Sequence, residues 1–398
     1  MTFKRRTIAF VYYPHHPEHD RLDTMPFAIT VIRKLIAAGW TIRLFLWEGD
    51  TCTDYRSLFP QNLSIEYVTM YTKRARLRIG ELGFRFFRYS YACVFSVGQL
   101  GSYVGRIISM ASKCPLVMLN DEFPSQVGQS IWTYLEKWSA HRANVIIVPS
   151  DDRKDRLIYE FDLEREKPFV TIHNTPEVDQ PLAELDWHSR FGIPQSKRIF
   201  LHAGLLHDWA QIPEIMTSVR HWPKDLVLLL HSKSGDGAVS YRREFSHLQD
   251  PERIFWSFEP LSEGMLHSLI SSVSGCFALY RNWDINTELI GASSGKLMRS
   301  IVCGTPVITS SFKSLEFVTR AGIGIQVNHP FEIPPAVHDL DNNAERYRKQ
   351  CLLFSAEEKL RQDKAWDELV AHVRKTSKAV NLYSPPRDEG RLELPITG

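Results

Sequence analysis

Apolar strand-like runs and amphipathic helix-like segments alternate along this chain, and the alternation stops once and then starts again. The first series opens with a β-branched and aromatic run at residues 7–13, a helical pattern at 26–38 and a second apolar run at 41–47. Strands that are joined by helices form a parallel sheet with right-handed crossovers. The pattern dissolves over residues 176–197, which we interpret as a linker, and a second series begins at residue 198.

The two series predict an α/β fold with two Rossmann-like, parallel-sheet domains. The first series predicts further strands at residues 64–68, 115–119, 145–148 and 169–172, and a helix at 131–142. The second predicts strands at 198–202, 226–231, 254–256, 276–280, 306–310 and 324–327, and helices at 212–220, 263–273 and 296–303. We therefore expect an N-terminal domain at 1–175, a C-terminal domain at 198–355, a helical segment at 356–383 and a frayed tail at 384–398. Ligands bind at the carboxyl ends of parallel strands, so the cleft between the domains is the expected site.

Composition excludes several classes of protein. The 48 basic and 46 acidic residues leave a formal net charge of +2, which gives no overall attraction to nucleic acid. The six cysteines are scattered and form no C-x-x-C pair, so we expect neither a disulfide framework nor a zinc site, and a cytoplasmic location. No apolar stretch approaches the roughly 18 residues of a membrane span, and the run at 8–13 is too short for a signal peptide. Any membrane contact is therefore expected to be peripheral.

The strongest chemical signal is a loop of small residues, Gly291 to Gly295, that precedes a helix beginning at Lys296. Free backbone N–H groups and the positive end of the helix dipole favour an anion at such a place. Glycine and serine let a phosphate approach the backbone closely, and the lysine adds a positive charge. We assign Ser293, Ser294, Gly295 and Lys296 to a diphosphate. The alternative is a serine-capped helix with a surface lysine.

The segment that contains this loop resembles the donor-binding segment of GT-B glycosyltransferases, and is most similar to bacterial family-four-like (group 1) enzymes that use sugar nucleotides. It reads SSGKLMRSIVCGTPVITSSFKSLEFVTRAGIGIQV. Other pieces resemble family motifs in the same order along residues 1–375, namely ANVIIVPSDDRKDRL, VTIHNTPEVD, RIFLHAGLLHDWAQIPEI and RIFWSFEPLSEGMLHSLISSVSGCFALYRN. The resemblance implies a GT-B fold with a central cleft, a nucleotide-sugar donor and a C-terminal helix that packs back toward the N-terminal domain.

The chain departs from the family pattern at the positions that bind the donor. Depending on the register, the second glutamate of the family's pair falls on Arg299 or on Lys296. The first strand of the second domain is followed by Gly204 without the family's usual arginine and lysine. The phosphate charge must then be met elsewhere, and we expect Lys296 first and Arg281 second. A solvated loop residue is the alternative for Arg281.

Three residues are candidates for binding the ribose, the base or the sugar of the donor. Glu288 stands in an E-L-I-G sequence that is similar to the family's first glutamate motif, and Gly204 follows the first strand of the second domain. Glu316 is the third candidate. Its alternative role is to cap the helix that follows Ser314.

A glycosyl transfer needs a stabilised leaving group and an activated acceptor hydroxyl. Asp121 and Glu122 follow one predicted strand and His16 follows the first, so all three are expected to face the cleft. These three are the candidate catalytic residues, and exposed polar loops explain them equally well. The pair Asp151 and Asp152 stands where helix caps belong, so we expect no metal ion and no cofactor beyond the donor.

The segment from Lys73 to Tyr91 combines basic and aromatic residues. Six basic residues and one acid stand between Lys73 and Arg88, with aromatic residues interleaved. Such a helix can lie on an anionic membrane, and family members with lipid-linked acceptors commonly use this region in that way. The alternative is a core helix with a solvated basic edge. No nucleic-acid-binding module is recognisable.

The expected function is therefore that of a metal-independent glycosyltransferase in bacterial surface polysaccharide or glycoconjugate synthesis. It would move a sugar from a nucleotide-diphosphate sugar to a glycan or lipid-linked acceptor. Two alternatives stay open: a nucleotide-sugar epimerase on the same scaffold, and a non-catalytic nucleotide-sugar-binding homologue. The nucleobase, the sugar, the acceptor and the stereochemical outcome are left open by the sequence.

Overall fold

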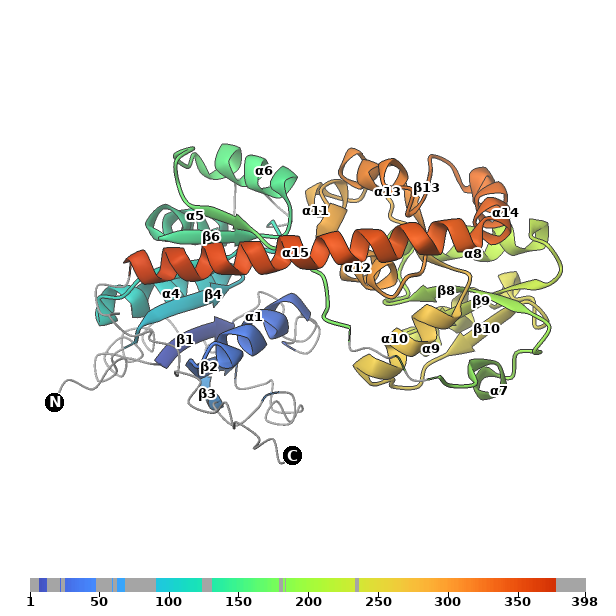
Figure 1. Cartoon of the computed structure of the whole chain (residues 1–398), viewed down its shortest axis with the longest axis horizontal. Coiled ribbons are helices and arrows are strands. Elements are labelled where there is room, and N and C mark those ends of the chain that lie inside the picture. Colours follow the sequence, from blue (N-terminus) through green and yellow to red (C-terminus); the bar gives the residue numbers. More distant parts are fainter. Residues whose placement is uncertain are drawn as a thin grey trace, which may run out of the picture.

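The structure is a computed structural model that describes residues 7–12, 22, 26–47, 59, 63–68, 91–123, 131–178, 182, 184–232 and 236–376. These residues form two α/β domains side by side, with one long helix running across both (Figure 1). Each domain is built on a parallel sheet, which confirms the predicted fold class. None of the described helices combines the length and the apolar character needed to cross a bilayer.

The sheet of the N-terminal domain has seven strands in the order β3-β2-β1-β4-β5-β6-β7, all parallel. Its central strands are apolar runs that are buried on both faces, as in other parallel sheets covered by helices. The described elements are β1 (Thr7–Tyr12), α1 (Pro26–Ala37), β2 (Thr41–Trp47), β3 (Leu63–Val68), β4 (Cys93–Val97), α4 (Gln99–Ser112), β5 (Leu116–Leu119), α5 (Ile131–Arg142), β6 (Val145–Val148), α6 (Asp151–Phe161) and β7 (Phe169–Thr171).

The short helix α7 (Trp187–Phe191) lies in the predicted linker, and the six-stranded sheet of the C-terminal domain follows in the order β10-β9-β8-β11-β12-β13. Its strands are β8 (Arg198–Ala203), β9 (Leu226–His231), β10 (Ile254–Ser257), β11 (Gly275–Ala278), β12 (Val307–Ser310) and β13 (Gly324–Val327). Its α-helices are α8 (Ile212–Ser218), α9 (Asp236–Glu244), α10 (Glu263–Ser272), α11 (Ile285–Glu288), α12 (Gly295–Val302), α13 (Glu316–Arg320) and α14 (Ile333–Asn342). Its 3₁₀ turns are η2 (Asp208–Ala210), η3 (Val219–His221), η4 (Ser246–Leu248), η5 (Gly291–Ser293), η6 (Lys313–Leu315) and η7 (Pro330–Glu332).

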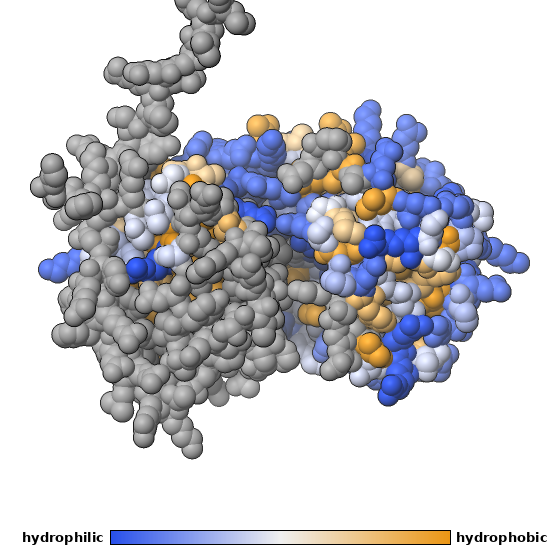
Figure 2. All heavy atoms as spheres, turned by 90° about the horizontal axis from the view of Figure 1, so that it is seen from below, coloured by the Kyte–Doolittle hydropathy of each residue, from blue (hydrophilic) through white to orange (hydrophobic). Residues whose placement is uncertain are grey.

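Figure 2 shows one side of the surface of this domain. Hydrophobic and hydrophilic residues are mixed over its described part, as is usual for a surface in contact with water.

The long helix α15 (Ala344–Thr376) contributes to the cores of both domains (Figure 1). Cys351, in its first half, is buried in the core of the C-terminal domain. Trp366 and Leu369, in its second half, are buried in the core of the N-terminal domain. The helix therefore covers the junction between the two sheets.

A buried carboxylate ties α15 to the chain where it leaves the first sheet. Glu358, near the middle of the helix, accepts hydrogen bonds from Thr175 Oγ1 at 3.1 Å and from Gln362 Nε2 at 2.7 Å. The ring of His173 lies 3.0 Å from the same carboxylate, and Arg361 donates to it at 2.8 Å. Because burying a carboxylate without partners is costly, these contacts hold the crossing segment against the helix.

The structure differs from the sequence prediction at several elements, among them β4, α4 and the start of α15. Strand β4 and helix α4 were not predicted, although β4 lies in the centre of the first sheet. The run CVFSV is short, and its polar Ser96 breaks the apolar pattern; the side chain is accommodated because the helix packs on it through Gly105, where a Cβ would lie 2.6 Å from that of Ser96. Helix α15 begins at Ala344 instead of residue 356, because no glycine or proline interrupts the sequence between these positions.

Three sequence predictions fall on residues that the structure does not describe. The first is the loop after β1, which contains His16, and the second is the tail at 384–398. The third is the basic and aromatic segment from Lys73 onward, of which only Tyr91 is described. Tyr91 is buried, with its ring edge-on to that of Phe45 at 6.4 Å between centroids.

Candidate functional site

The loop of small residues lies where the sequence predicted it, at the start of α12. Ser294 is the N-cap residue, and its hydroxyl accepts a hydrogen bond from the backbone N–H of Leu297 at 3.1 Å. The same hydroxyl shares a short hydrogen bond with the hydroxyl of Tyr280, which follows β11. Gly291 has a φ of 31°, and a Cβ there would lie 3.0 Å from the carbonyl oxygen of Ser314. The loop therefore needs glycine at this position and serine at the cap.

Two backbone donors remain at the positive end of this helix. The N–H of Ser294 donates to Gly291 and the N–H of Met298 donates to Ser294. Within the described part of the chain, the N–H groups of Gly295 and Lys296 have no hydrogen-bond partner. A helix begins with such unpaired donors, and together with the helix dipole they attract an anion.

The ammonium group of Lys296 is buried against two aromatic rings. Its Nζ lies 4.7 Å from the ring centroid of Tyr280 and 5.1 Å from that of Trp209, and these rings stack at 5.9 Å with an angle of 4°. No acceptor among the described residues pairs with this Nζ. Burial lowers the pKa of Lys296 to about 7, because the charged form loses its hydration without gaining a counter-ion.

The groups behind Lys296 are basic as well. His202 on β8 is fully buried, and burial followed by the nearby Lys296 charge lowers its pKa well below the usual value. Its Nε2 faces the carbonyl oxygen of Leu205 at 3.3 Å. Burial likewise lowers the pKa of His231 on β9. Arg299, the other basic residue at the family's glutamate position, lies one turn further along α12 with its Nε buried. The positive charge at the helix start is therefore that of Lys296.

The helix start lies at the junction of the two domains. Asn174, just after β7 of the N-terminal domain, donates from its backbone N–H to the carbonyl oxygen of Ala292 at 3.0 Å and from Nδ2 to that of Ser293 at 3.1 Å. A Cβ on Gly295 would lie 3.2 Å from Asn174 Nδ2. The loop thus faces the N-terminal domain, as the predicted cleft requires. Asn174 was not singled out from the sequence.

A buried arginine joins the domains beside this loop. Arg153 of α6 donates to the carbonyl oxygens of Asp121, by a short bond, and of Leu289 and Asn286, each at 3.2 Å. The side chain of Asn286 in turn bonds both ways with the backbone of Phe123, at 2.7 and 2.8 Å. The sequence analysis missed Arg153. Its signal is the spacing of Arg153 with the buried Leu157 and Phe161 on one face of the helix, where a surface arginine would not stand.

The predicted carboxylates lie at this junction too. Asp121 and Glu122 follow β5, as predicted, and both favour the charged form of the neighbouring Arg153, whose pKa burial lowers. Behind them lies a carboxyl that the sequence analysis missed: Glu136 of α5, which accepts from Asn120 Nδ2 at 2.9 Å and whose pKa burial raises to about 8. His16 lies outside the described residues, so the structure does not place it relative to this pair.

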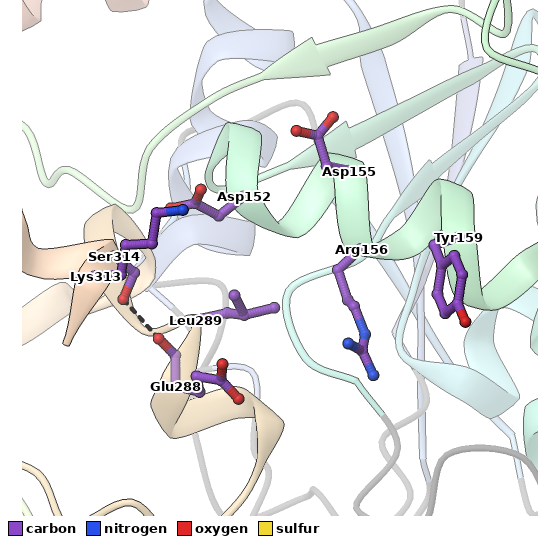
Figure 3. Close-up of a pocket in the computed structure, with 8 residues that line it drawn as sticks. All are labelled: Asp152, Asp155, Arg156, Tyr159, Glu288, Leu289, Lys313 and Ser314. Atoms are coloured by element: carbon purple, nitrogen blue, oxygen red, sulfur yellow. Dashed lines mark hydrogen bonds between the residues drawn. The ribbon is translucent and has the colours of Figure 1, made fainter.

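A hollow of about 460 Å³ opens between α6 and the segments α11 and η6 (Figure 3). Figure 3 shows Lys313 and Asp152 pointing toward one another across it, with Glu288 on the C-terminal side. The hydroxyl of Ser314 donates to the carbonyl oxygen of Glu288 at 2.7 Å. The lining residues are Asp152, Asp155, Arg156, Tyr159, Glu288, Leu289, Lys313 and Ser314.

The remaining predicted residues lie around the edge of the site. Arg281 is 44% exposed and forms an ion pair with Glu214 of α8. Glu316 begins α13 and pairs with Arg320 at 3.4 Å, and no side chain caps the start of this helix by a hydrogen bond. Gly204 follows β8 with a φ of 151°, and a Cβ there would meet open space. Among the described residues, no cluster of three histidine, cysteine or acidic side chains is suited to a metal ion.

Solved structures share this architecture, although the sequence matches no protein-family model and no curated protein matches it. The Anabaena protein Alr3699/HepE in complex with UDP-glucose matches with a TM-score of 0.67 and 13% identity, over 92% of this chain and 99% of that chain. The lipopolysaccharide outer core galactosyltransferase WaaB matches at 0.61 and 10%, over 92% and 99%. A UDP-N-acetylglucosamine 2-epimerase matches at 0.60 and 10%, over 96% and 100%. At these identities the likeness shows the fold alone, and it confirms the predicted GT-B fold.

Proposed function

We propose that this chain is a glycosyltransferase that moves a sugar from a nucleoside-diphosphate sugar to a glycan or lipid-linked acceptor. The observation that carries the proposal is the buried ammonium of Lys296 beside the N–H groups of Gly295 and Lys296, at the junction of two GT-B domains. None of these groups has a hydrogen-bond partner among the described residues. A cation without a counter-ion in a buried site is costly unless an anion binds there. A diphosphate supplies that anion.

The proposed chemistry uses the two sides of the junction differently. The bond from the sugar to the diphosphate breaks, and the charge that develops on the leaving phosphate is stabilised by the α12 N–H groups and Lys296. The acceptor hydroxyl bonds to the anomeric carbon, and a carboxylate takes its proton. Asp121 and Glu122 are the proposed bases, since they follow β5 at the same junction. We assign no role to a metal ion or to a cofactor beyond the donor.

The experiment is a thermal-shift screen with uridine, guanosine and thymidine diphosphates and their sugars, followed by a transfer assay. A nucleotide at about 100 times its Kd adds roughly 2.7 kcal/mol of stability, so the matching nucleoside diphosphate is expected to raise the unfolding temperature clearly. The matching nucleotide sugar is then incubated with glycan and lipid-linked acceptors, and products are identified by mass spectrometry. A protein that no nucleotide stabilises would contradict the proposal.

An epimerase is the second candidate, because an epimerase shares the fold. The product separates the two: an epimerase converts its nucleotide sugar without an acceptor, whereas a transferase releases the nucleotide only as the acceptor is glycosylated. A third outcome, binding without turnover over the whole acceptor panel, would favour a non-catalytic homologue, which the basic residue at the family's glutamate position makes conceivable.

The cellular setting of the proposal rests on the sequence. We place the protein at the cytoplasmic side of a bacterial membrane, in surface polysaccharide or glycoconjugate synthesis. The basic residues between Lys73 and Arg88 are proposed to contact anionic lipid, whereas Tyr91 at the end of this segment is buried in the core. Co-sedimentation with phosphatidylglycerol vesicles tests the contact. Substituting glutamine for the basic residues of that segment should abolish co-sedimentation without changing nucleotide binding.

The cap of α12 offers a further prediction. Ser294→Ala removes the acceptor for Leu297 N–H and the partner of the Tyr280 hydroxyl, so we expect it to lower the free energy of unfolding by about 1–2 kcal/mol. It should also weaken nucleotide binding, because the first turn that presents the N–H groups is less ordered. Urea denaturation and nucleotide titration measure the two effects.

Ser262→Ala is the matched control. Ser262 caps α10 by accepting from the N–H of Met265 at 3.3 Å, and it lies away from the loop of small residues. The control should cost about 1 kcal/mol of stability and leave nucleotide affinity unchanged. Equal nucleotide affinities in the two variants would speak against a binding role for the start of α12.

A further inference from the structure

Four aromatic rings follow one another from the buried lysine to the surface of the C-terminal domain. Tyr280 stacks on Trp209, and Trp209 stacks on His207 at 6.0 Å between centroids. Trp283 meets His207 edge-on at 6.4 Å with an angle of 89°. We call these four residues the aromatic row. They come from the loops after β8 and β11, which are neighbouring strands, so the row stands at the carboxyl edge of the sheet.

The outer end of the aromatic row is exposed. Trp283 is 66% exposed, and Leu205, in the same loop after β8 as His207, is 70% exposed. Burial of a large aromatic ring is favourable because it removes apolar surface from water, and the fold of this domain does not bury the ring of Trp283. Exposed apolar side chains that gather beside a binding site mark a surface that a ligand covers.

The backbone below Trp283 is fixed. Its N–H donates to Thr287 Oγ1 at 3.0 Å, and Asp284 and Thr287 form a capping box at the start of α11. The two loops are joined by the hydrogen bond from Arg281 N–H to the carbonyl oxygen of Trp209, at 2.7 Å. Because the backbone of Trp283 is already ordered, binding of a ligand to its ring costs little conformational entropy. The contact is in this sense preorganised.

We propose that Trp283 and His207 form a platform for the sugar ring of the donor, an inference that rests on the function proposed above. The inner end of the aromatic row contacts Lys296, where the diphosphate is proposed to bind. In a nucleotide sugar, the sugar ring is bonded directly to the terminal phosphate. Trp209 contacts Lys296 and His207 stacks on the outer side of Trp209, so His207 lies where a sugar next to the phosphate is expected. A sugar has an apolar C–H face that packs on aromatic carbon.

The geometry of the platform distinguishes a sugar from a nucleobase. A flat base is held best between parallel faces, whereas Trp283 and His207 stand at right angles and form a corner. A pyranose ring carries C–H groups on its faces and hydroxyls around its rim, so that one face can pack on one ring of the corner while the rim meets the other ring. The platform therefore sets affinity for the sugar and leaves affinity for the nucleotide to the helix start and Lys296.

The test compares two ligands that differ only by the sugar. Isothermal titration of UDP and of UDP-glucose, or of GDP and GDP-mannose where the wild-type protein prefers guanosine, is made with wild-type protein and Trp283→Ala. We expect the Kd of the nucleotide sugar to rise about tenfold, as the loss of one aromatic contact implies, and the Kd of the free nucleotide to stay within twofold. Trp283→Phe should recover part of the affinity.

Phe331→Ala is the matched control, because Phe331 is 83% exposed and contacts His329 at 4.6 Å in a similar pair on η7 of the same domain. It should change neither Kd. Equal weakening of nucleotide and nucleotide sugar in Trp283→Ala would overturn the inference, since the ring would then contact the nucleotide. So would unchanged affinity for both ligands. A wild-type protein that binds no nucleotide would instead refute the proposed function itself.

Discussion

Lys296→Met is expected to stabilise the ligand-free protein and to weaken nucleotide-sugar binding strongly. The charged amine is buried against Trp209 and Tyr280 and has no hydrogen-bond partner among the described residues, so it loses its hydration energy on folding without compensation. Methionine has a similar length, and its thioether packs well against aromatic rings. Removing a charged hydrogen-bond donor from a phosphate costs roughly 1.5–3 kcal/mol, which corresponds to about a 10- to 150-fold rise in Kd.

The stability gain should depend on pH in a defined direction. Lysine has a pKa of 10.5 in the unfolded chain and about 7 in the folded protein, so the unfolded state binds more protons between these values. The free energy of unfolding therefore rises with pH across this window, and the penalty is complete below pH 7. It amounts to a few kcal/mol at most, at about 1.36 kcal/mol per pKa unit.

Urea denaturation of both proteins from pH 6 to pH 9.5 measures this difference. We expect the stability advantage of Lys296→Met to be largest at pH 6 and to shrink as the pH rises. Lys349→Met, at an exposed position of α15, is the matched control and should change neither stability nor nucleotide binding appreciably. A wild-type protein that is more stable than Lys296→Met at pH 6 would show that the amine has a partner in solution.

Arg153→Met is expected to cause the largest loss of stability at the domain junction. The substitution leaves the carbonyl oxygens of Asp121, Asn286 and Leu289 without this donor in a buried place. Each unpaired buried group costs about 1–3 kcal/mol, and we expect a total of about 3–5 kcal/mol because the junction relaxes in part. The measurement is the free energy of unfolding from urea denaturation.

Arg156→Met tests whether the effect belongs to the junction or to the helix. Arg156 lies one turn further along α6 and pairs with Glu160 on its surface, so its loss should cost less than about 1 kcal/mol. Hydrogen exchange gives an independent measurement: in Arg153→Met, protection should fall in the backbone N–H of Phe123, which bonds to Asn286 across the junction. Equal stability of the two arginine variants would contradict this assignment.

The sequence predicted those parts of the molecule whose signals are local. Strands β2, β6, β9 and β13 and helix α5 were predicted at their observed bounds, because each is an apolar or amphipathic run between clear breaks. The start of α12 was predicted from its small residues and its serine cap. In contrast, β4 was missed because Ser96 interrupts a short run and is accommodated only by a glycine on the helix that covers it.

Features that depend on two distant segments could not be predicted. The burial of Lys296 follows from Trp209 and Tyr280, which other loops contribute. Arg153 is one more charge in a charged helix, and its partners Asn286 and Leu289 come from the other domain. The aromatic row likewise exists only after β8 and β11 become neighbours.

The helix α15 limits how the two halves of this protein can move. Its 33 residues make a rod about 50 Å long, with one end seated in each core and Glu358 near its midpoint. Pulling the halves straight apart would drag Trp366 or Cys351 out of a packed interior, which costs far more than thermal energy. Turning one half about the axis of the rod leaves these residues buried in their cores, and the contacts that it must break are those of Arg153, Asn174 and Asn286 at the junction. If substrates enter between the two domains, we expect the junction to open by rotation of one domain about the axis of α15 and not by separation of the domains.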